Sequence, residues 1–167
     1  MTATVQLEQQ EDFHFAIGFG DGIPLLHSDE HPPLGKGAGP TPDQLLAAAV
    51  GNCMSASLLF ALRKFKQAPE PIRTEVEATT GRNEANRLRI QRIAVRITLG
   101  VPAAGLQHLD RALQQFEAFC TVGESVRQGI PDWSLLDRLI TEWQPAALIV
   151  GLPLNMDDSE NEMTRAA

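Results

Sequence analysis

The two cysteines of this 167-residue chain, Cys53 and Cys120, are the side chains best suited to chemistry. A thiolate is both a nucleophile and a redox centre, and two thiols that meet in space can form a disulfide reversibly. In a cytosolic protein, a pair of cysteines is more often free, catalytic or redox-active than a structural cross-link. The first question for the fold is therefore whether it brings these two sulfurs together.

Other side chains offer fewer options for chemistry. The four histidines show no metal-ligand spacing with either cysteine, so we expect no metal and no bound cofactor. A formal net charge of −7 argues against a nucleic-acid partner, because such surfaces need clustered cations to neutralise phosphates. Five arginines are interleaved with acidic residues and lack stacking aromatics, so we expect them on a solvated strand face. They are Arg82, Arg87, Arg89, Arg92 and Arg96.

The composition predicts a cytoplasmic protein with one main hydrophobic core. A chain of 167 residues with 43% hydrophobic side chains suits one domain of ordinary size. The first twelve residues carry no Lys or Arg and no long apolar run, which predicts the absence of a signal peptide. We find no stretch that approaches the roughly 18 apolar residues of a membrane span. We therefore expect no membrane partner.

Cys53 falls inside a long predicted helix. The segment Thr41–Gln44 supplies an N-cap, a proline in the first turn, an acid and the glutamine that closes a capping box. Apolar residues between positions 45 and 62 surround the helix on nearly all sides, which indicates a helix buried in the centre of the fold. Cys53 lies about three turns in, beyond the reach of this helix's own N-terminal dipole.

Cys120 falls between two predicted helices. Before it, four apolar residues recur at helical spacing and predict an amphipathic helix that ends near Phe119. They are Leu106, Leu109, Leu113 and Phe116. After it, Thr121 and Glu124 form a capping box that opens a short helix to Gln128. Cys120 is thus expected at a helix N-terminus.

Two antiparallel hairpins complete the set of elements. Alternating aromatic residues over positions 13–19 predict a strand, and Asp21–Gly22 predicts a hairpin turn to a second strand over 23–27. Segments 72–78 and 93–99 alternate between apolar and polar residues. They predict a second antiparallel pair with one solvated face.

Three segments resemble the OsmC/Ohr family, and the likeness covers about residues 1–130. The run Gly39–Ala48 (GPTPDQLLAA) is similar to the family's entry into its central helix, and Gly51–Cys53 (GNC) to the segment with the reactive thiol. Phe119–Val122 (FCTV) resembles the Cys-Pro-Val-Ser segment of the second thiol, with Thr121 where proline is usual. The combination is more specific than either cysteine alone.

This resemblance implies an α+β fold, in which antiparallel sheets pack around a long central helix and two subunits intertwine in a homodimer. It also implies a thiol-dependent peroxidase that reduces organic hydroperoxides and serves in oxidative stress defence. In such an enzyme Cys53 attacks the peroxide as a thiolate, and Cys120 condenses with the resulting sulfenic acid. A dithiol reductant then reopens the disulfide.

The resemblance further implies an activating arginine, which this chain lacks at the family position. Family members supply it from the N-terminal strand region and hold it with a Glu at the start of the central helix, where Asp43 stands here. The first arginine of this chain is Arg63. Positive charge for Cys53 could come from a second subunit or from other cations of the chain. These are Lys36, His14, His27, His31 and Arg63. The alternative hypothesis is a non-catalytic dimer of the same fold.

A second resemblance begins at Gly129–Pro131. The segment from there to Ala167 is similar to the middle of YqgF-type proteins, the Holliday-junction-resolvase-like or pre-16S rRNA nucleases. We therefore divide the chain into an OsmC/Ohr-like domain over 1–130 and a YqgF-like fragment over 131–167 that is not an independent domain.

The fragment predicts a helix over 134–143, a strand over 147–152 and an acidic tail. Its 37 residues hold seven acidic and two basic side chains. Two-metal nucleases hold their ions with carboxylates from distant strands. The acidic motifs of the YqgF family outside this fragment are absent, so we expect a solvated tail and an inactive nuclease remnant. The tail's carboxylates are Asp157, Asp158, Glu160 and Glu162.

Overall fold

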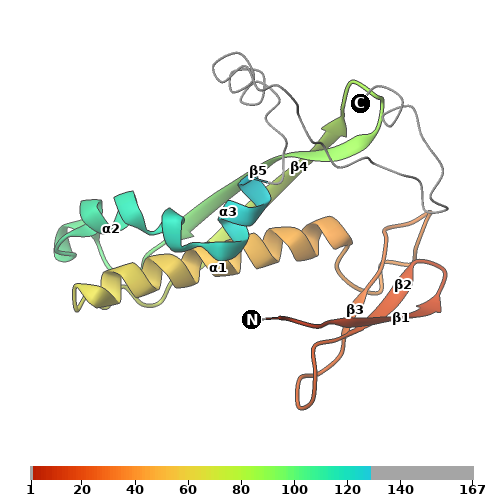
Figure 1. The fold of residues 1–167 in the computed structure, drawn as a ribbon, viewed down its shortest axis with the longest axis horizontal. Helices are drawn as coiled ribbons and strands as arrows, with labels where there is room; N and C mark the ends of the chain where they lie inside the picture. The colour runs from red at the N-terminus through yellow and green to blue at the C-terminus, as the bar shows by residue number, and fades with distance from the viewer. Residues whose placement is uncertain (1, 129–167) are drawn as a thin grey trace, which may run out of the picture. The chain divides into compact units, whose positions relative to one another are not determined.

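A long helix, α1 (Pro42–Lys64), runs through the described part of the chain (Figure 1). The computed structural model describes residues 2–128, so the helix expected over 134–143, the strand expected over 147–152 and the acidic tail lie outside the described residues. The predicted start of α1 is confirmed, since the Thr41 N–H donates a 2.9 Å hydrogen bond to Gln44 Oε1.

α1 is buried on one side only, which corrects the expectation of a helix buried all round. Leu58 and Leu62 are 3% and 0% exposed, whereas Phe60 between them is 56% exposed. Every fourth residue from position 48 to position 60 is exposed in the single chain. We call these four residues the open stripe: Ala48, Asn52, Ala56 and Phe60. A sequence pattern shows that a side chain is apolar, but not which surface covers it.

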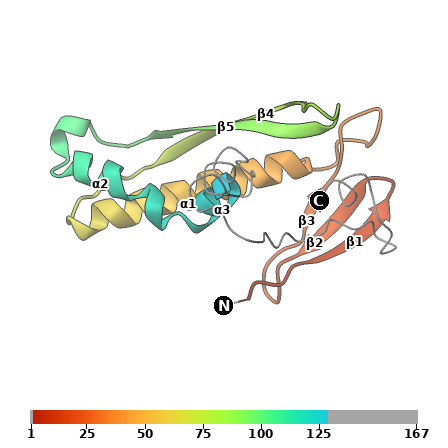
Figure 2. The same cartoon turned by 45° about the horizontal axis from the view of Figure 1, so that its top comes forward.

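The predicted second hairpin packs along α1, as Figure 2 shows. β4 (Arg73–Arg82) and β5 (Leu88–Thr98) pair in antiparallel register, with Val76 opposite Val95. A Cβ on Gly51 of α1 would overlap Val76 Cγ2, so the glycine permits the close approach of helix and strand. This contact ties the segment just before Cys53 to β4.

The arginines of this hairpin lie on a solvated face, as predicted. Arg96 pairs with Glu75 at 3.1 Å, and the two side chains remain 80% and 75% exposed. Exposed ion pairs of this kind contribute little to stability, because water screens them and both side chains lose entropy.

Short helices join β5 to the second cysteine. η1 (Ala103–Gly105), α2 (Leu109–Gln115) and η2 (Glu117–Phe119) precede Cys120, and α3 (Thr121–Gln128) follows it. The prediction of α3 is confirmed, and Cys120 immediately precedes its first residue.

α2 differs from its prediction in its start and in its buried face. It begins after His108, whose left-handed conformation (φ 61°) interrupts the helical repeat. Ala112 and Phe116 join the core formed with Leu58 and its neighbours on α1. Leu113, expected on the apolar stripe, is 45% exposed, because Ala112 and Phe116, one turn apart, form the face that packs in the core.

The first strands form an antiparallel sheet in the order β1 (Gln6–Glu11), β2 (His14–Gly18), β3 (Leu26–Ser28). β1 was not predicted, because its six residues (QLEQQE) are all exposed and show no alternation of apolar and polar side chains. The predicted aromatic face is only partly right. Phe13 and Phe19 lie outside β2 and are 50% and 42% exposed.

The proline-rich loop between β3 and α1 is ordered around a buried carboxylate. Asp29, 2% exposed, accepts N–H groups from Glu30, Lys36 and Ala38 at 2.8, 2.9 and 3.0 Å. These three hydrogen bonds lower the pKa of Asp29, and the one from the Ala38 N–H has the largest effect. A lowered pKa stabilises the fold above the ordinary pKa of the carboxyl, and this contribution is lost as the pH falls through the lowered value.

The expectation that no segment is as long and apolar as a membrane span was wrong. α1 contains an 18-residue window of mean hydropathy 1.9, so by length and composition it passes the test for a membrane span. The core helix of a water-soluble protein passes the same test, and α1 contacts β4, β5, α2 and α3.

Replacement of Leu62 by Ala tests this core. The Leu62 side chain is fully buried, so Leu62→Ala is expected to lower the free energy of unfolding by about 2–5 kcal/mol. Denaturant unfolding at a fixed protein concentration measures it. Leu88→Ala is the matched control, because Leu88 is 59% exposed and should change stability by no more than about 0.5 kcal/mol. Equal effects of the two substitutions would contradict the assignment of the core.

Candidate functional site

The two cysteine side chains meet at the first turn of α3. Cys53 comes from the middle of α1 and is partly exposed, whereas Cys120 precedes α3 and is 2% exposed. Both thiols are free, and each is a hydrogen-bonding neighbour of the other. The site therefore pairs a sulfur that solvent can reach with one that it cannot.

The backbone of α3 donates one N–H to each sulfur. The first N–H groups of a helix have no partner within the helix, and an N-cap side chain usually satisfies one of them. Here Cys120 occupies the cap position and its Sγ accepts the Gly123 N–H at 3.3 Å. The Val122 N–H turns to the other sulfur and donates to Cys53 Sγ at 3.5 Å. Thr121, predicted as the cap, is instead the first helical residue.

These contacts shift the two thiols in opposite directions. Burial, the largest single influence on Cys53, disfavours its thiolate, but donors from Val122, Cys120, Gly123 and Ser57 outweigh it and lower the pKa of Cys53. Burial, together with the bond to Cys53, raises the pKa of Cys120. The thiolate of the pair is therefore expected on the partly exposed sulfur, where a nucleophile is useful.

Gly123 makes this close arrangement possible. A Cβ at that position would stand 2.9 Å from Cys120 Sγ and 3.6 Å from Met54 Cγ. Any larger side chain would press on the sulfur that caps α3. No sequence signal points to this role, because a glycine within a short predicted helix does not reveal which side chain it will meet.

Asp43 does not join the thiols. Its carboxylate bonds to the Thr41 hydroxyl and accepts the Gln44 N–H at 3.2 Å, so its described contacts serve the start of α1. Ten residues at about 1.5 Å per residue separate it from Cys53 by roughly 15 Å along the helix. Asp43 also lines a hollow with Glu30, His31 and other residues, and none of the described residues that line that hollow is an arginine.

Most of the cations proposed for Cys53 have partners elsewhere. Lys36 pairs with Glu11 at 2.7 Å, and Arg63 pairs with Glu70 at 2.6 Å. The rings of the two strand histidines, His14 and His27, approach each other to 2.9 Å between nitrogens. His31 lines the hollow at the start of α1.

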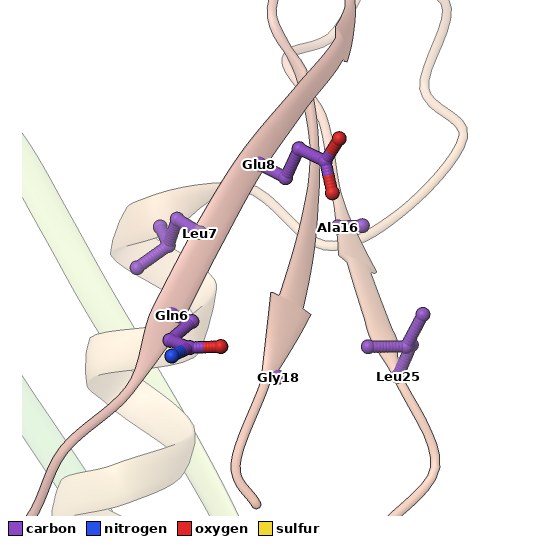
Figure 3. A pocket seen from close by; sticks show the side chains of 6 residues that line it. All are labelled: Gln6, Leu7, Glu8, Ala16, Gly18 and Leu25. Atoms are coloured by element: carbon purple, nitrogen blue, oxygen red, sulfur yellow. The ribbon is translucent and has the colours of Figure 1, made fainter.

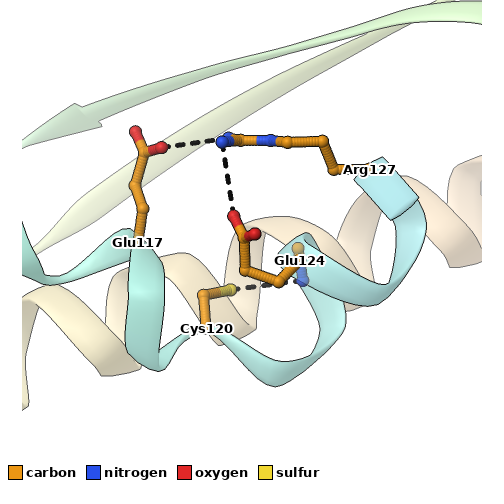
Figure 4. A network of polar contacts seen from close by, with 5 residues as sticks. Glu117, Cys120, Glu124 and Arg127 are labelled. Atoms are coloured by element: carbon orange, nitrogen blue, oxygen red, sulfur yellow. Dashed lines mark hydrogen bonds and ion pairs between the residues drawn. The ribbon is translucent and has the colours of Figure 1, made fainter. Parts of the chain in front are cut away.

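Sequence reasoning missed one cation on α3 that lies close enough to Cys120 for their charges to interact. Arg127 of α3 contacts Glu117 at 2.9 Å and Glu124 at 3.3 Å, and its charge interacts with Cys120 (Figure 4). The only available signal was the prediction of α3 itself, which places Arg127 two turns after Cys120.

Two further features of the described residues bear on chemistry. No group of three His, Cys, Asp or Glu side chains within residues 2–128 is arranged to hold a metal ion. The hollow in Figure 3 lies on the first sheet between β1, β2 and Leu25, and no residue that lines it is a cysteine or a histidine. Its lining includes Leu7 and Leu25, which are 61% and 62% exposed.

The larger part of the chain resembles one known family. The model of the OsmC-like protein family matches residues 35–133. An OsmC-like protein of Vibrio cholerae has a similar structure, with a TM-score of 0.62 at 14% identity, covering 75% of this chain and 93% of that one. The organic hydroperoxide resistance protein OhrB of Bacillus subtilis gives a TM-score of 0.58 at 17% identity, covering 76% and 91%. These structures confirm the predicted α+β fold.

A shorter segment matches different proteins. It is 58% identical over 41 residues to a candidate pre-16S rRNA nuclease of Marinobacter nauticus, covering 25% of this chain and 29% of that protein. The relative from Acinetobacter baylyi is 55% identical over 42 residues, again covering 25% and 29%. The chain thus spans less than a third of the length of these relatives. The resemblance of one chain to two families is confirmed.

The Val122 N–H can be removed by proline, which the first turn of a helix tolerates. Val122→Pro should raise the pKa of Cys53, because a donor to the thiolate is lost, and should slow alkylation at neutral pH by up to about tenfold. The rate of iodoacetamide alkylation of Cys53, followed from pH 5 to pH 10 by mass spectrometry, gives this pKa. Before substitution the midpoint should lie below the ordinary thiol value of about 8.5.

Thr121→Pro is the matched control for this experiment. It places proline one residue earlier, at a position whose backbone N–H donates to neither sulfur. Proline favours an extended conformation in the residue before it, and Cys120 is already extended (ψ 92°). Circular dichroism verifies that both variants keep their helices. The assignment is wrong if the two prolines leave the Cys53 profile equally unchanged.

Proposed function

Because the chain belongs to the OsmC-like protein family, we propose that it is a thiol-dependent peroxidase that reduces organic hydroperoxides with Cys53 and Cys120. The family and its structural relatives support redox chemistry. The observation that carries the proposal is the Val122 N–H on Cys53 Sγ beside the buried Cys120 thiol. It gives one chain a stabilised thiolate and a second sulfur within reach.

The proposed catalytic cycle begins at the Cys53 thiolate. The Cys53 thiolate attacks the terminal oxygen of the hydroperoxide, the O–O bond breaks, and the alkoxide leaves and takes a proton to become an alcohol. Cys53 is now a sulfenic acid. The Cys120 thiol condenses with it, which forms the disulfide and releases water. An external dithiol then reduces the disulfide by two exchange steps and is itself oxidised.

The roles of the two sulfurs follow from their surroundings. Cys53 is partly exposed and has the lowered pKa, so it is the proposed peroxide-reactive residue. Cys120 is buried and has the raised pKa, so its thiol form is favoured, and it is the proposed resolving thiol. Asp43 is proposed to act only by fixing the start of α1, because its described contacts are made there.

The chain's lack of the family arginine favours the second candidate, a non-catalytic dimer. Lys36 and Arg63 are committed to exposed ion pairs with Glu11 and Glu70. Backbone donors from α3 are the proposed substitute for that arginine. The inactive nuclease remnant stays a third prediction, since its carboxylates lie outside the described residues.

We also infer a homodimer in which a partner covers the open stripe of α1. The stripe presents Ala48, Ala56 and Phe60 to solvent in the single chain. β4 and β5 form a two-stranded sheet, and such sheets are marginal unless further strands or a packed face support them. A second copy that contributes strands and covers α1 would satisfy both needs. The homodimer fits a soluble, cytoplasmic protein.

Serine variants test the peroxidase directly. Cys53→Ser should abolish consumption of cumene hydroperoxide in the presence of a dithiol, because it removes the nucleophile. Cys120→Ser should still turn over one equivalent and accumulate a sulfenic acid that dimedone labels at Cys53. Hydroperoxide loss is followed by a colorimetric peroxide assay. Equal activity of Cys53→Ser and the unsubstituted chain would exclude the proposal.

A charge on the open stripe tests the dimer. Ala56→Glu should shift the molar mass, measured by light scattering after size-exclusion chromatography, from dimer to monomer, because a buried unpaired carboxylate is unfavourable. Ala104→Glu adds the same charge to exposed η1 and should leave the dimer intact. A dimer that tolerates Glu at position 56 would show that another surface makes the interface.

A further inference from the structure

Arg127 ties together the two segments that flank Cys120. Glu117 of η2 lies three residues before this cysteine, and Glu124 of α3 lies four residues after it. The guanidinium contacts both carboxylates, at 2.9 and 3.3 Å, so that one side chain bridges the turn (Figure 4). Guanidinium suits this geometry, because its planar fork presents several N–H donors at once.

We propose that Arg127 is a positioning residue of the thiol pair, which holds the first turn of α3 so that its N–H groups stay directed at Cys53 and Cys120. The proposal rests on the proposed function and deepens it. The Gly123 N–H reaches Cys120 and the Val122 N–H reaches Cys53 only while η2 and α3 keep their angle at Cys120. The bridge from Glu117 to Glu124 fixes that angle.

The charges around Arg127 distinguish a positioning role from a direct electrostatic effect on the Cys53 thiolate. Within residues 2–128, the titratable groups that act on Arg127 are Glu117, Glu124 and Cys120. On charge alone, removal of the Glu117 carboxylate would favour a nearby thiolate and lower the pKa of Cys53. If the bridge positions α3, the same removal loosens the turn and raises that pKa. The two accounts therefore predict opposite signs.

An ordinary surface ion pair is the competing account. Arg127 is 62% exposed, Glu117 46% and Glu124 32%, and isolated exposed pairs contribute little to stability. This pair differs from that of Arg96 and Glu75 in two ways. It contains two acceptors for one arginine, and it spans a turn that carries a reactive sulfur.

The experiment compares Arg127→Ala, Arg127→Lys and Glu117→Gln with the full unsubstituted chain. Arg96→Ala is the matched control, because it breaks an exposed arginine–carboxylate pair of similar length away from the thiols. Two quantities are measured for each protein. They are the pKa of Cys53 from its alkylation profile and the rate of Cys53–Cys120 disulfide formation with diamide, which takes up the two electrons and two protons. Thermal unfolding confirms that every variant is folded.

Positioning predicts that Arg127→Ala and Glu117→Gln both raise the pKa of Cys53, by up to about one unit, and slow disulfide formation by up to about tenfold. Arg127→Lys should fall between them and the unsubstituted chain, and Arg96→Ala should change neither quantity. The proposal is overturned if Arg127→Ala behaves like Arg96→Ala, or if Glu117→Gln lowers the pKa. Diamide requires no hydroperoxide, so a failed peroxidase assay with a normal diamide result would reject the proposed function alone.

Discussion

The site depends on the unpaired N–H groups at the start of one short helix. Every helix begins with N–H groups that find no carbonyl within the helix, and side chains or water usually accept their hydrogen bonds. In this protein the acceptors are two sulfur atoms, one from the residue before α3 and one from the middle of α1. The same contacts that complete the helix also lower the pKa of Cys53, so local structure and reactivity have one cause.

Other parts of the described chain hold the two sulfurs against the first turn of α3. α1 must carry Cys53 to α3, and a core of Leu58, Leu62 and Phe116 fixes α1 against the segment before Cys120. Gly123 leaves room for Cys120 Sγ, and Gly51 allows β4 to approach α1. The family arginine would act through a full charge, whereas the donors here are backbone dipoles. The proposed role of Arg127 on α3 is therefore to position these donors rather than to supply a charge.

Much of the fold was predictable, because its main elements have strong local signals. The start of α1 at Thr41, the pairing of β4 with β5 and the presence of α3 were all correct, although β4 and β5 reach closer to their turn than predicted. β1 was missed, since an exposed strand of Glu and Gln has no apolar pattern and depends on its pairing with β2. The two cysteines were identifiable from the sequence, but their donors were not. Cys53 is indeed far from the start of its own helix, and only tertiary structure shows that another helix begins beside it.

The most direct measurement is an NMR titration of the reduced full chain labelled with ¹³C at the cysteine β-carbons, which reports each thiol separately. The account predicts that Cys53 titrates below the ordinary thiol pKa of about 8.5 and that Cys120 titrates above it. Coincident titration of both cysteines near 8.5, or a higher midpoint for Cys53 than for Cys120, would contradict it.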